Sequence, residues 1–353
     1  MGNKESVFNI ANKLIKGHCL SKKEYMVLIE NANNAKLVKF LADEAVALRQ
    51  RYYGKKVFTR GLIEFTNYCK NDCYYCGIRH GNKNAVRYRL MKEDILECCN
   101  YGYELGFHTF VLQGGEDPYF TDERVVDIVR SIKAEHPDCA VTLSIGEKSY
   151  ESYRLFREAG ADRYLLRHET ANDCHYNVLH PQEMKLSNRK QCLYDLKSLG
   201  YQVGAGCMVG TPGQTVETLA EDMVFLQELQ PQMVGIGPFI PHHDTKFANE
   251  PSGSVELTLF LLSLARIMLP KSLIPATTAL GTADDNGREK GMAVGCNVVM
   301  PNLSPLKNRK NYDLYDNKIS TGEEAAESKK AMERRMRSVG YELVYERGDA
   351  VST

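Results

Sequence analysis

Three cysteines, Cys69, Cys73 and Cys76, lie within one eight-residue segment and could bind a metal centre together. Thiolates at this spacing in one loop can bind three irons of a [4Fe–4S] cluster, and such clusters usually have four cysteine ligands. Three thiolates leave one iron with an open coordination position, which is typical of catalytic rather than structural metal sites. The spacing therefore predicts a catalytic iron–sulfur site.

Two other interpretations of these cysteines stay open. A structural zinc site has four ligands, usually in two CxxC-like pairs, and His80 is the obvious nearby candidate for a fourth. The three could also be unrelated core residues, since eight more cysteines are scattered along the chain. A disulfide framework is not expected, because the total of eleven is odd and we expect a cytoplasmic protein.

The elements that must position the cysteines alternate between apolar, β-branched segments and amphipathic ones. Strands that alternate with helices pair in parallel through right-handed crossovers. Eight such units favour an α/β fold of the closed (β/α)8 TIM-barrel type over its alternative, an open Rossmann-like sheet. The predicted strands are Val57–Asn67, His108–Gly115, Ala140–Glu147, Arg163–Glu169, Gln202–Gly210, Met233–Phe239, Ser272–Leu280 and Cys296–Leu303. The predicted helices between them are Lys92–Gly106, Asp122–His136, Ser149–Gly160, Arg189–Gly200, Val216–Leu229 and Val255–Leu269.

The chain is expected to divide into three parts. Residues 1–55 would form an N-terminal helical extension that caps the barrel, with helices over Ser21–Asn33 and Ala35–Tyr53. Residues 56–310 would form the barrel. Residues 311–353 would form a C-terminal helical tail packed on it, with a polar helix over Gly322–Gly340 and with Tyr341–Glu346 as a short strand or a packed end.

The composition excludes some classes of partner and location. Lys+Arg and Asp+Glu both number 45, so no net basic field favours nucleic acid or an anionic membrane surface. The N-terminal residues contain no apolar core of signal-peptide length. The longest apolar run, Leu257–Leu269, is interrupted by Ser263 and Arg266 and is too short to span a bilayer. We therefore expect a cytoplasmic protein.

The cysteine segment resembles the signature of the radical S-adenosylmethionine (SAM) superfamily. That signature has the Cx3Cx2C spacing with an aromatic residue before the last cysteine, and Tyr75 occupies this position. The resemblance implies that the open iron of a [4Fe–4S] cluster chelates the amino and carboxylate groups of SAM. One electron then cleaves the sulfonium, giving methionine and a 5′-deoxyadenosyl radical.

Longer segments are similar to the HydE family, the radical SAM maturases of [FeFe]-hydrogenase. Biotin synthase and methylornithine synthase are relatives on the same barrel. The similar segments occur in order between about residues 57 and 310; they are Arg60–Cys69, Val111–Pro118, Thr142–Glu147, Arg163–Thr170, Met208–Thr215, Ile236–His242, Ile274–Gly281 and Asn297–Asn302. Many family members carry a second cysteine cluster near the C-terminal end of the barrel. Residues 308–323 contain no cysteine, which rules out a second cluster with ligands there.

The resemblance also assigns roles to residues at predicted strand ends. Tyr75, Gly114, Gly115, Glu116, Glu169 and Arg189 are expected to bind SAM, with Glu169 at its ribose or methionine part and Arg189 at its carboxylate. Arg167 and Glu169, two residues apart on one strand, would point the same way. Arg167 would face an anionic ligand. Together with short polar groups it would line a substrate cavity; these groups are Gln113, Thr142, Ser144, Thr277 and Thr278.

In the HydE family, the substrate is a cysteine-bound iron carbonyl-cyanide complex supplied by a partner maturase. The resemblance thus implies a small carboxylate-bearing or iron-cysteine substrate, an electron donor such as flavodoxin or ferredoxin, and contact with other hydrogenase maturases. A paralogue that acts on an amino acid, like methylornithine synthase, is the alternative enzyme. Two further alternatives are a non-catalytic iron–sulfur carrier and a zinc-stabilised binding module.

Overall fold

The structure is a computed structural model that describes residues 7–319 and 325–351. Six parallel strands form its main sheet in the order β2 (Gly61–Thr66), β3 (Thr109–Gly114), β4 (Ala140–Ser144), β5 (Arg163–Leu165), β6 (Gln202–Ala205) and β8 (Met233–Val234). Parallel bridges join Met233 to Leu273, Pro275 to Val298 and Leu62 to Asn302. These bridges close the sheet into a ring, which confirms the predicted (β/α)8 barrel.

Short strands extend the ring at both ends. β7 (Met208–Val209) pairs with β9 (Gly237–Pro238) beyond the C-terminal ends of β6 and β8. At the other end, β1 (Lys56–Thr59) pairs in parallel with β10 (Val298–Val299) and with β11 (Glu342–Val344). The single strand predicted over Val57–Asn67 is interrupted at Arg60. The segment before the cysteines therefore forms two strands, β1 and β2.

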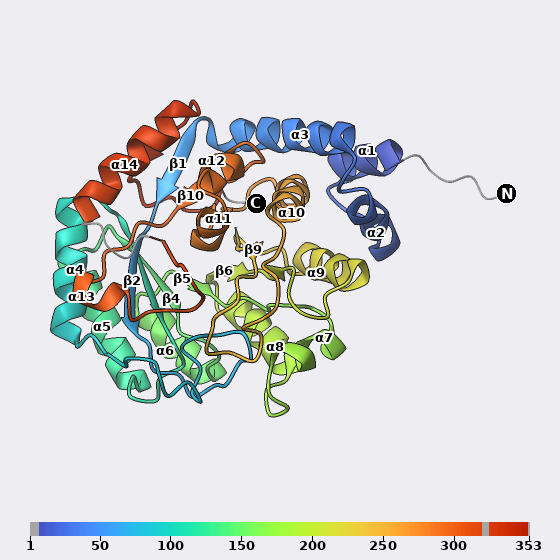
Figure 1. Ribbon diagram of the computed structural model, residues 1–353. Helices are drawn as coiled ribbons and strands as arrows, with labels where there is room; N and C mark the ends of the chain where they lie inside the picture. The colour runs from blue at the N-terminus through green and yellow to red at the C-terminus, as the bar shows by residue number, and fades with distance from the viewer. Residues whose placement is uncertain (1–6, 320–324, 352–353) are drawn as a thin grey trace.

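Helices surround the ring, as Figure 1 shows, because each buries one apolar side against the strands. In the helix after β4, the Ser149 side chain accepts the Ser152 N–H at the start, and Gly160 ends the helix at a φ of 112°. Glycine suits that left-handed position because it has no side chain. The helices that follow β2, β3, β4, β5, β7 and β9 are α4 (Lys92–Glu104), α5 (Asp122–Glu135), α6 (Tyr150–Ala159), α8 (Leu186–Ser198), α9 (Val216–Leu229) and α10 (Val255–Met268).

Three helices precede the barrel: α1 (Val7–Gly17), α2 (Lys22–Glu30) and α3 (Ala35–Tyr53). α2 packs on α9 and α3 on α10, so this part covers one side of the ring (Figure 1). Ser21 and Glu24 form a capping box at the start of α2. α1 was not among the predicted helices.

The strand predicted over Ser272–Leu280 is largely wrong. Only Leu273 and Pro275 bridge to neighbouring strands, and α11 (Thr278–Ala283) begins where the strand was expected to continue. The Thr277 hydroxyl accepts the Leu280 N–H at 3.2 Å, and this N-cap starts a helix in place of strand pairing. Three short helices were not predicted; they are α7 (Asp173–Leu179), α12 (Gly287–Met292) and α13 (Leu306–Arg309).

The C-terminal residues of the chain cover the side of the barrel at which its strands begin. After α14 (Ala325–Ser338), strand β11 joins β1, so the C-terminal part is not only helical. The buried Arg163 guanidinium donates to the backbone carbonyls of Arg347 and Gly348 at 2.7 and 3.0 Å. Among the described residues, no helix is both long and apolar enough to cross a membrane.

Candidate active site

The three cysteines lie in the loop between β2 and α4, at the C-terminal end of the barrel. Cys69, Cys73 and Cys76 all line one cavity of about 240 Å3. None of them forms a disulfide. Burial raises the pKa of Cys69, and it raises the pKa of Cys76 to about 12. Three half-buried thiols that converge on one cavity suit a cationic metal centre, because a metal stabilises the thiolate form that binds it.

A single arginine holds the loop in shape. The Arg87 guanidinium donates to the carbonyls of Asn67, Ile78, Arg79 and Asn82 at 2.5 to 3.1 Å. These four bonds draw the segments before and after the cysteines together. The loop has little regular secondary structure, and its conformation is held by these hydrogen bonds from the Arg87 side chain to backbone carbonyls.

The aromatic residue of the motif also lines this cavity. The Tyr75 hydroxyl lies 3.3 Å from His180 Nε2, and the two rings meet edge to face at 5.4 Å. Burial, together with the nearby Arg189 cation, lowers the pKa of His180 to about 3. His180 is therefore neutral near pH 7 and contributes no charge to the cavity wall.

Glycines let the end of β3 approach the cluster loop. A Cβ on Gly115 would lie 2.2 Å from the Tyr68 carbonyl oxygen, and one on Gly114 would lie 2.7 Å from Thr66 Cγ2. The Glu116 side chain is buried; its carboxylate accepts the Glu147 N–H at 2.9 Å and lies 3.2 Å from Lys70 Nζ. Gly114, Gly115 and Glu116 all line the cavity.

Three charged residues, Arg167, Glu169 and Arg189, also line the cavity. Arg167 Nη2 lies 2.8 Å from Glu169 Oε2, and Arg189 Nη1 donates to the Arg167 carbonyl at 2.8 Å. Arg189 Nε also donates to Glu147 at 2.5 Å. Arg167 and Glu169 point the same way, as predicted, but regular strand alternation is not the reason, because β5 ends at Leu165 and Glu169 forms only an isolated bridge to Cys207. The two side chains meet through a left-handed turn, with Glu169 at a φ of 65°.

The other residues predicted to bind substrate lie apart from this cavity wall. Gln113 Nε2 donates to the Tyr312 hydroxyl at 3.4 Å. The buried Thr142 hydroxyl has no hydrogen-bond partner among the described residues. Thr277 caps α11 and Thr278 is its first residue, so neither lies on a strand as predicted. Gln113, Thr142, Ser144, Thr277 and Thr278 are all absent from the lining of the 240 Å3 cavity.

Sequence reasoning missed a segment that covers the barrel mouth. Tyr312, Leu314 and Tyr315 line the cavity, although they follow the predicted barrel and carry no recognisable motif. Lys318 Nζ lies 2.5 Å from Oε1 of the buried Glu64. The aromatic spacing of Tyr312 and Tyr315 in a polar stretch is the one local signal that could have pointed to this segment.

Comparison with known proteins gives matches over most of the chain. Residues 63–226 match the model of the Radical SAM superfamily. The [FeFe] hydrogenase maturase subunit HydE of Thermotoga maritima is 50% identical over 297 residues, which cover 84% of this chain and 83% of that protein. The 3-methylornithine synthase of Methanosarcina acetivorans is 30% identical over 315 residues, 88% of each chain.

Solved structures show the same architecture. The crystal structure of methylornithine synthase (PylB) aligns with a TM-score of 0.80 at 26% identity, covering 95% of this chain and 97% of that one. The maturase HydG from Carboxydothermus hydrogenoformans aligns with a TM-score of 0.79 at 21% identity, covering 97% and 80%. The second match supports the fold alone.

Proposed function

Because this chain belongs to the HydE family of radical SAM enzymes, we propose that it acts in assembly of the [FeFe]-hydrogenase H-cluster, on a cysteine-bound iron carbonyl-cyanide precursor. A [4Fe–4S] cluster and SAM are the cofactors of this enzyme class. The observation that carries the proposal is the convergence of three cysteine thiols, Glu169 and Arg189 on one cavity at the barrel mouth.

We assign the cluster to Cys69, Cys73 and Cys76. Three thiolates leave one iron free for SAM, and the bound cluster supplies the single electron that cleaves the sulfonium. The loop, held by Arg87, keeps the three thiols facing the cavity.

The cavity walls offer complementary groups for SAM. The Arg189 guanidinium, which is buried, would meet the SAM carboxylate, since a planar cation suits that bidentate contact. Glu169 would bind the ribose or methionine part, while Gly114 and Gly115 bring backbone groups close to the SAM amino group. Tyr75 and Glu116 complete the wall beside the cysteines.

The substrate would lie deeper in the barrel. Arg167 faces the cavity, and the unpaired Thr142 hydroxyl is a buried polar group that a ligand could satisfy. With Gln113, Ser144, Thr277 and Thr278 they would bind a small carboxylate-bearing or iron-cysteine substrate. The remaining partners would be other hydrogenase maturases and an electron donor such as flavodoxin or ferredoxin, in the cytoplasm.

Substitution of one cluster ligand tests this assignment. Cys73→Ala should fold as the wild type does but contain less iron and yield no 5′-deoxyadenosine under reducing conditions. Thermal unfolding and iron content are measured beside SAM cleavage, and Cys174→Ala, a change at an exposed cysteine outside the cavity, is the matched control. Retained SAM cleavage by Cys73→Ala would remove Cys73 from the cluster.

A second candidate function is a radical rearrangement of an amino acid. It is favoured by the match to 3-methylornithine synthase over 88% of this chain. The cleavage of SAM is measured with each protein amino acid and, separately, with an iron-cysteine complex. The substrate that stimulates cleavage distinguishes the second candidate function from the first. Substrate-dependent 5′-deoxyadenosine with a free amino acid alone would favour the second function, whereas a cluster that does not bind SAM would favour an iron–sulfur carrier.

A further inference from the structure

We propose that Lys318 and Glu64 are positioning residues of the active site, because their ion pair holds the side chain of Tyr312 in the wall of the cavity. The inference rests on the proposed function, in which this cavity binds SAM. Lys318 and Glu64 lie outside the lining of the cavity, whereas Tyr312 lines it together with the three cysteines. The pair would therefore act on a bound ligand through Tyr312.

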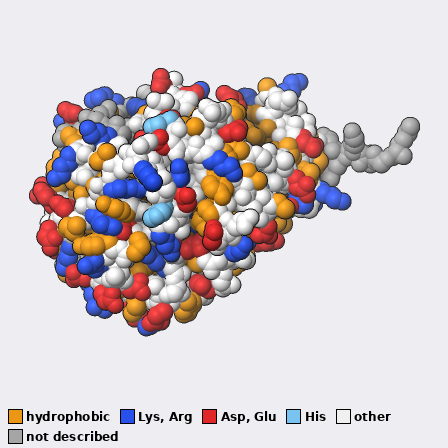
Figure 2. All heavy atoms as spheres, turned by 60° about the horizontal axis from the view of Figure 1, so that its bottom comes forward, with side chains coloured by type: hydrophobic (Ala, Val, Ile, Leu, Met, Phe, Trp, Pro, Cys, Tyr) orange, Lys and Arg blue, Asp and Glu red, His pale blue; other side chains and the backbone are white. Residues whose placement is uncertain are grey.

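The ion pair is buried inside the barrel. Charged side chains of both signs are spread over the surface of the protein, as Figure 2 shows for one face. In contrast, Lys318 Nζ lies 2.5 Å from Glu64 Oε1, and the two side chains are only 6% and 1% exposed. The other carboxylate oxygen, Glu64 Oε2, accepts a hydrogen bond from the Asn302 side-chain amide at 2.8 Å. Both oxygens of this carboxylate therefore have a donor.

Stability alone does not explain a charged pair in this place. Burial removes both charges from water, and their attraction can return only part of that cost, so apolar side chains of similar size often give an equally stable fold. The two residues are 254 positions apart, and they join the covering segment, residues 312–318, to strand β2. A charge-assisted hydrogen bond needs one partner at a short distance, so it fixes the place of this segment more narrowly than apolar packing would.

Lys318 contacts Tyr312 in two ways. Its Nζ atom donates to the Tyr312 carbonyl at 2.8 Å and lies 4.8 Å from the centroid of the Tyr312 ring. A cation at this distance is attracted to an aromatic ring when it lies over the ring face. Glu64 supplies the opposite charge that keeps Nζ in this place. The ion pair thus holds both the backbone and the ring of Tyr312.

The hydroxyl end of Tyr312 is held by the neighbouring strand. Gln113 Nε2 donates to this hydroxyl at 3.4 Å, and Gln113 lies opposite Glu64 in the pairing of β2 with β3. Tyr312 is only 2% exposed, and it lines the cavity, whereas Gln113 does not. The side chain of Tyr312 therefore extends from the cavity to a residue that we assign to the substrate. A change in its position would alter the boundary between the two ligands.

Other contacts attach the covering segment at different points. The Gly77 N–H donates to the Leu314 carbonyl at 3.0 Å, which joins the segment to the cluster loop. His243 Nδ1 lies 2.6 Å from Asp316 Oδ1, which joins it to the loop after β9. These contacts do not involve Tyr312. Loss of the ion pair should therefore free the Tyr312 side chain while the rest of the segment stays attached.

Two variants separate positioning from folding. Lys318→Met leaves the Glu64 carboxylate buried without its cation, so it should lower the free energy of unfolding. Lys318→Met/Glu64→Gln removes both charges and keeps a side-chain oxygen as acceptor for Asn302. This double variant should regain most of the lost free energy of unfolding, which urea denaturation measures. A change at Tyr312 in the double variant then reports on positioning rather than on lost stability.

The place of the Tyr312 ring is measured by fluorine NMR on protein that carries 3-fluorotyrosine at residue 312, without cluster or SAM. The wild type should give one resonance. The double variant should give more than one, or one broadened by exchange, because the ring is no longer held in a single place. The matched control is Arg335→Met/Glu289→Gln, which removes an ion pair of the same length between α14 and α12, outside the cavity lining. Its spectrum should match that of the wild type.

The consequence for the site is measured by equilibrium dialysis of SAM with the reconstituted proteins. The Lys318→Met/Glu64→Gln variant should bind SAM at least about fivefold more weakly than the wild type, and the control should bind it equally well. A wild type that binds no SAM would contradict the proposed function, while the fluorine spectra would still decide whether the pair positions Tyr312. A single resonance in the double variant as narrow as that of the wild type, whatever its shift, would overturn the inference. Equal SAM affinities of the wild type and the double variant would also overturn it.

Discussion

The Nε2 atom of His168 lies 3.2 Å from Oδ1 of Asp222, and the same oxygen accepts the Ala171 N–H at 2.5 Å. Both side chains are buried, and His168 packs edge-on against Phe225 of α9. The Gly206 N–H donates to His168 Nδ1 at 3.3 Å, whereas His168 Nε2, beside the carboxylate, makes no hydrogen bond among the described residues. This pair therefore supports the backbone around Glu169 from outside the ring of strands.

Removal of the Asp222 carboxylate should weaken both the fold and SAM binding. Asp222→Ala leaves the buried Ala171 N–H without its acceptor, which costs about 1–3 kcal/mol of unfolding free energy. Glu169, held at a φ of 65°, would lose the contacts that stabilise this left-handed conformation. Urea denaturation and equilibrium dialysis with SAM measure the two effects.

Asp222→Asn is the control for this prediction. It keeps an acceptor of the same size for the Ala171 N–H, so it should lose less stability than Asp222→Ala. If the alanine variant retained wild-type unfolding free energy and SAM affinity, the support that we assign to Asp222 would not exist.

Gly146 and Gly200 form a matched pair for testing the cavity wall. Both have left-handed backbones, with φ of 76° and 75°. A Cβ on Gly146 would lie 2.0 Å from Glu116 Cγ, whereas a Cβ on Gly200 would meet nothing within 4 Å. Each alanine variant should lose roughly 1–2 kcal/mol of stability from backbone strain. Only Gly146→Ala should also weaken SAM binding, because it displaces Glu116; equal SAM affinities for the two variants would contradict this prediction.

Arg189→Ala should weaken SAM binding by roughly 1.5–3 kcal/mol, the value of a hydrogen bond to a charged group. Arg189 is buried in the cavity wall, where a lost guanidinium cannot be replaced by solvent as it would be on the surface. Equilibrium dialysis with SAM measures the change, and Arg154→Ala, at an exposed arginine of α6, is the control. An unchanged affinity for SAM in Arg189→Ala would assign Arg189 to a purely structural role with Glu147.

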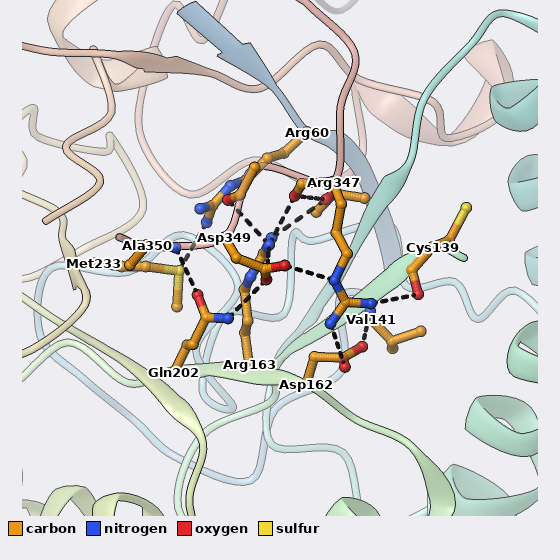
Figure 3. A network of polar contacts seen from close by, with 12 residues as sticks. Arg60, Cys139, Val141, Asp162, Arg163, Gln202, Met233, Arg347, Asp349 and Ala350 are labelled. Atoms are coloured by element: carbon orange, nitrogen blue, oxygen red, sulfur yellow. Dashed lines mark hydrogen bonds and ion pairs between the residues drawn. The ribbon is translucent and has the colours of Figure 1, made fainter. Parts of the chain in front are cut away.

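The ion pairs of Asp349 at the N-terminal end of the barrel make the stability of the fold depend on pH. Figure 3 shows Asp349 between Arg163, Arg347 and Gln202. Burial alone would raise the pKa of Asp349, but hydrogen bonds and charge from Arg163, helped by Gln202 and Arg347, lower it to about 2. A carboxyl whose pKa falls on folding contributes stability above its unfolded pKa, and this contribution is lost as the pH falls toward 2.

Asp349→Asn measures this contribution. At pH 7 the variant should be less stable by about 1 kcal/mol, a value reduced for the 40% exposure of the Asp349 side chain. The difference in urea unfolding free energy between wild type and variant should shrink as the pH falls from about 5 to about 3. A difference that stays constant, or grows at acid pH, would contradict the ion-pair assignment.

Local patterns predicted much of the fold. The helices over Ala35–Tyr53 and Val216–Leu229 have the predicted bounds, because their apolar periodicity and N-caps Asn34 and Thr215 are local signals. Strand lengths were less predictable. In the strand predicted over Arg163–Glu169, regular pairing stops at Leu165, and only an isolated bridge from Glu169 to Cys207 follows. The residue at which pairing ends depends on the length and position of the neighbouring strand. The sequence of one strand alone does not contain that information.

The part of the site that lies within one loop could be predicted from the sequence. The parts formed by contacts between distant segments could not. Cys69, Cys73 and Cys76 form a motif that can be read from spacing alone. The cover formed by Tyr312 and Tyr315, and the contact between Lys318 and Glu64, join residues far apart in the chain. No local period marks such contacts, so they emerge only once the barrel is closed.

The most direct test of the central claim, that the cavity holds a SAM-cleaving cluster, is an anaerobic one. The protein is reconstituted with iron and sulfide, reduced with dithionite and mixed with SAM, while EPR spectra and 5′-deoxyadenosine are recorded. The structure predicts a reduced [4Fe–4S] signal that changes on addition of SAM, together with 5′-deoxyadenosine formation. A cluster signal that ignores SAM, or a colourless protein that retains zinc, would contradict it.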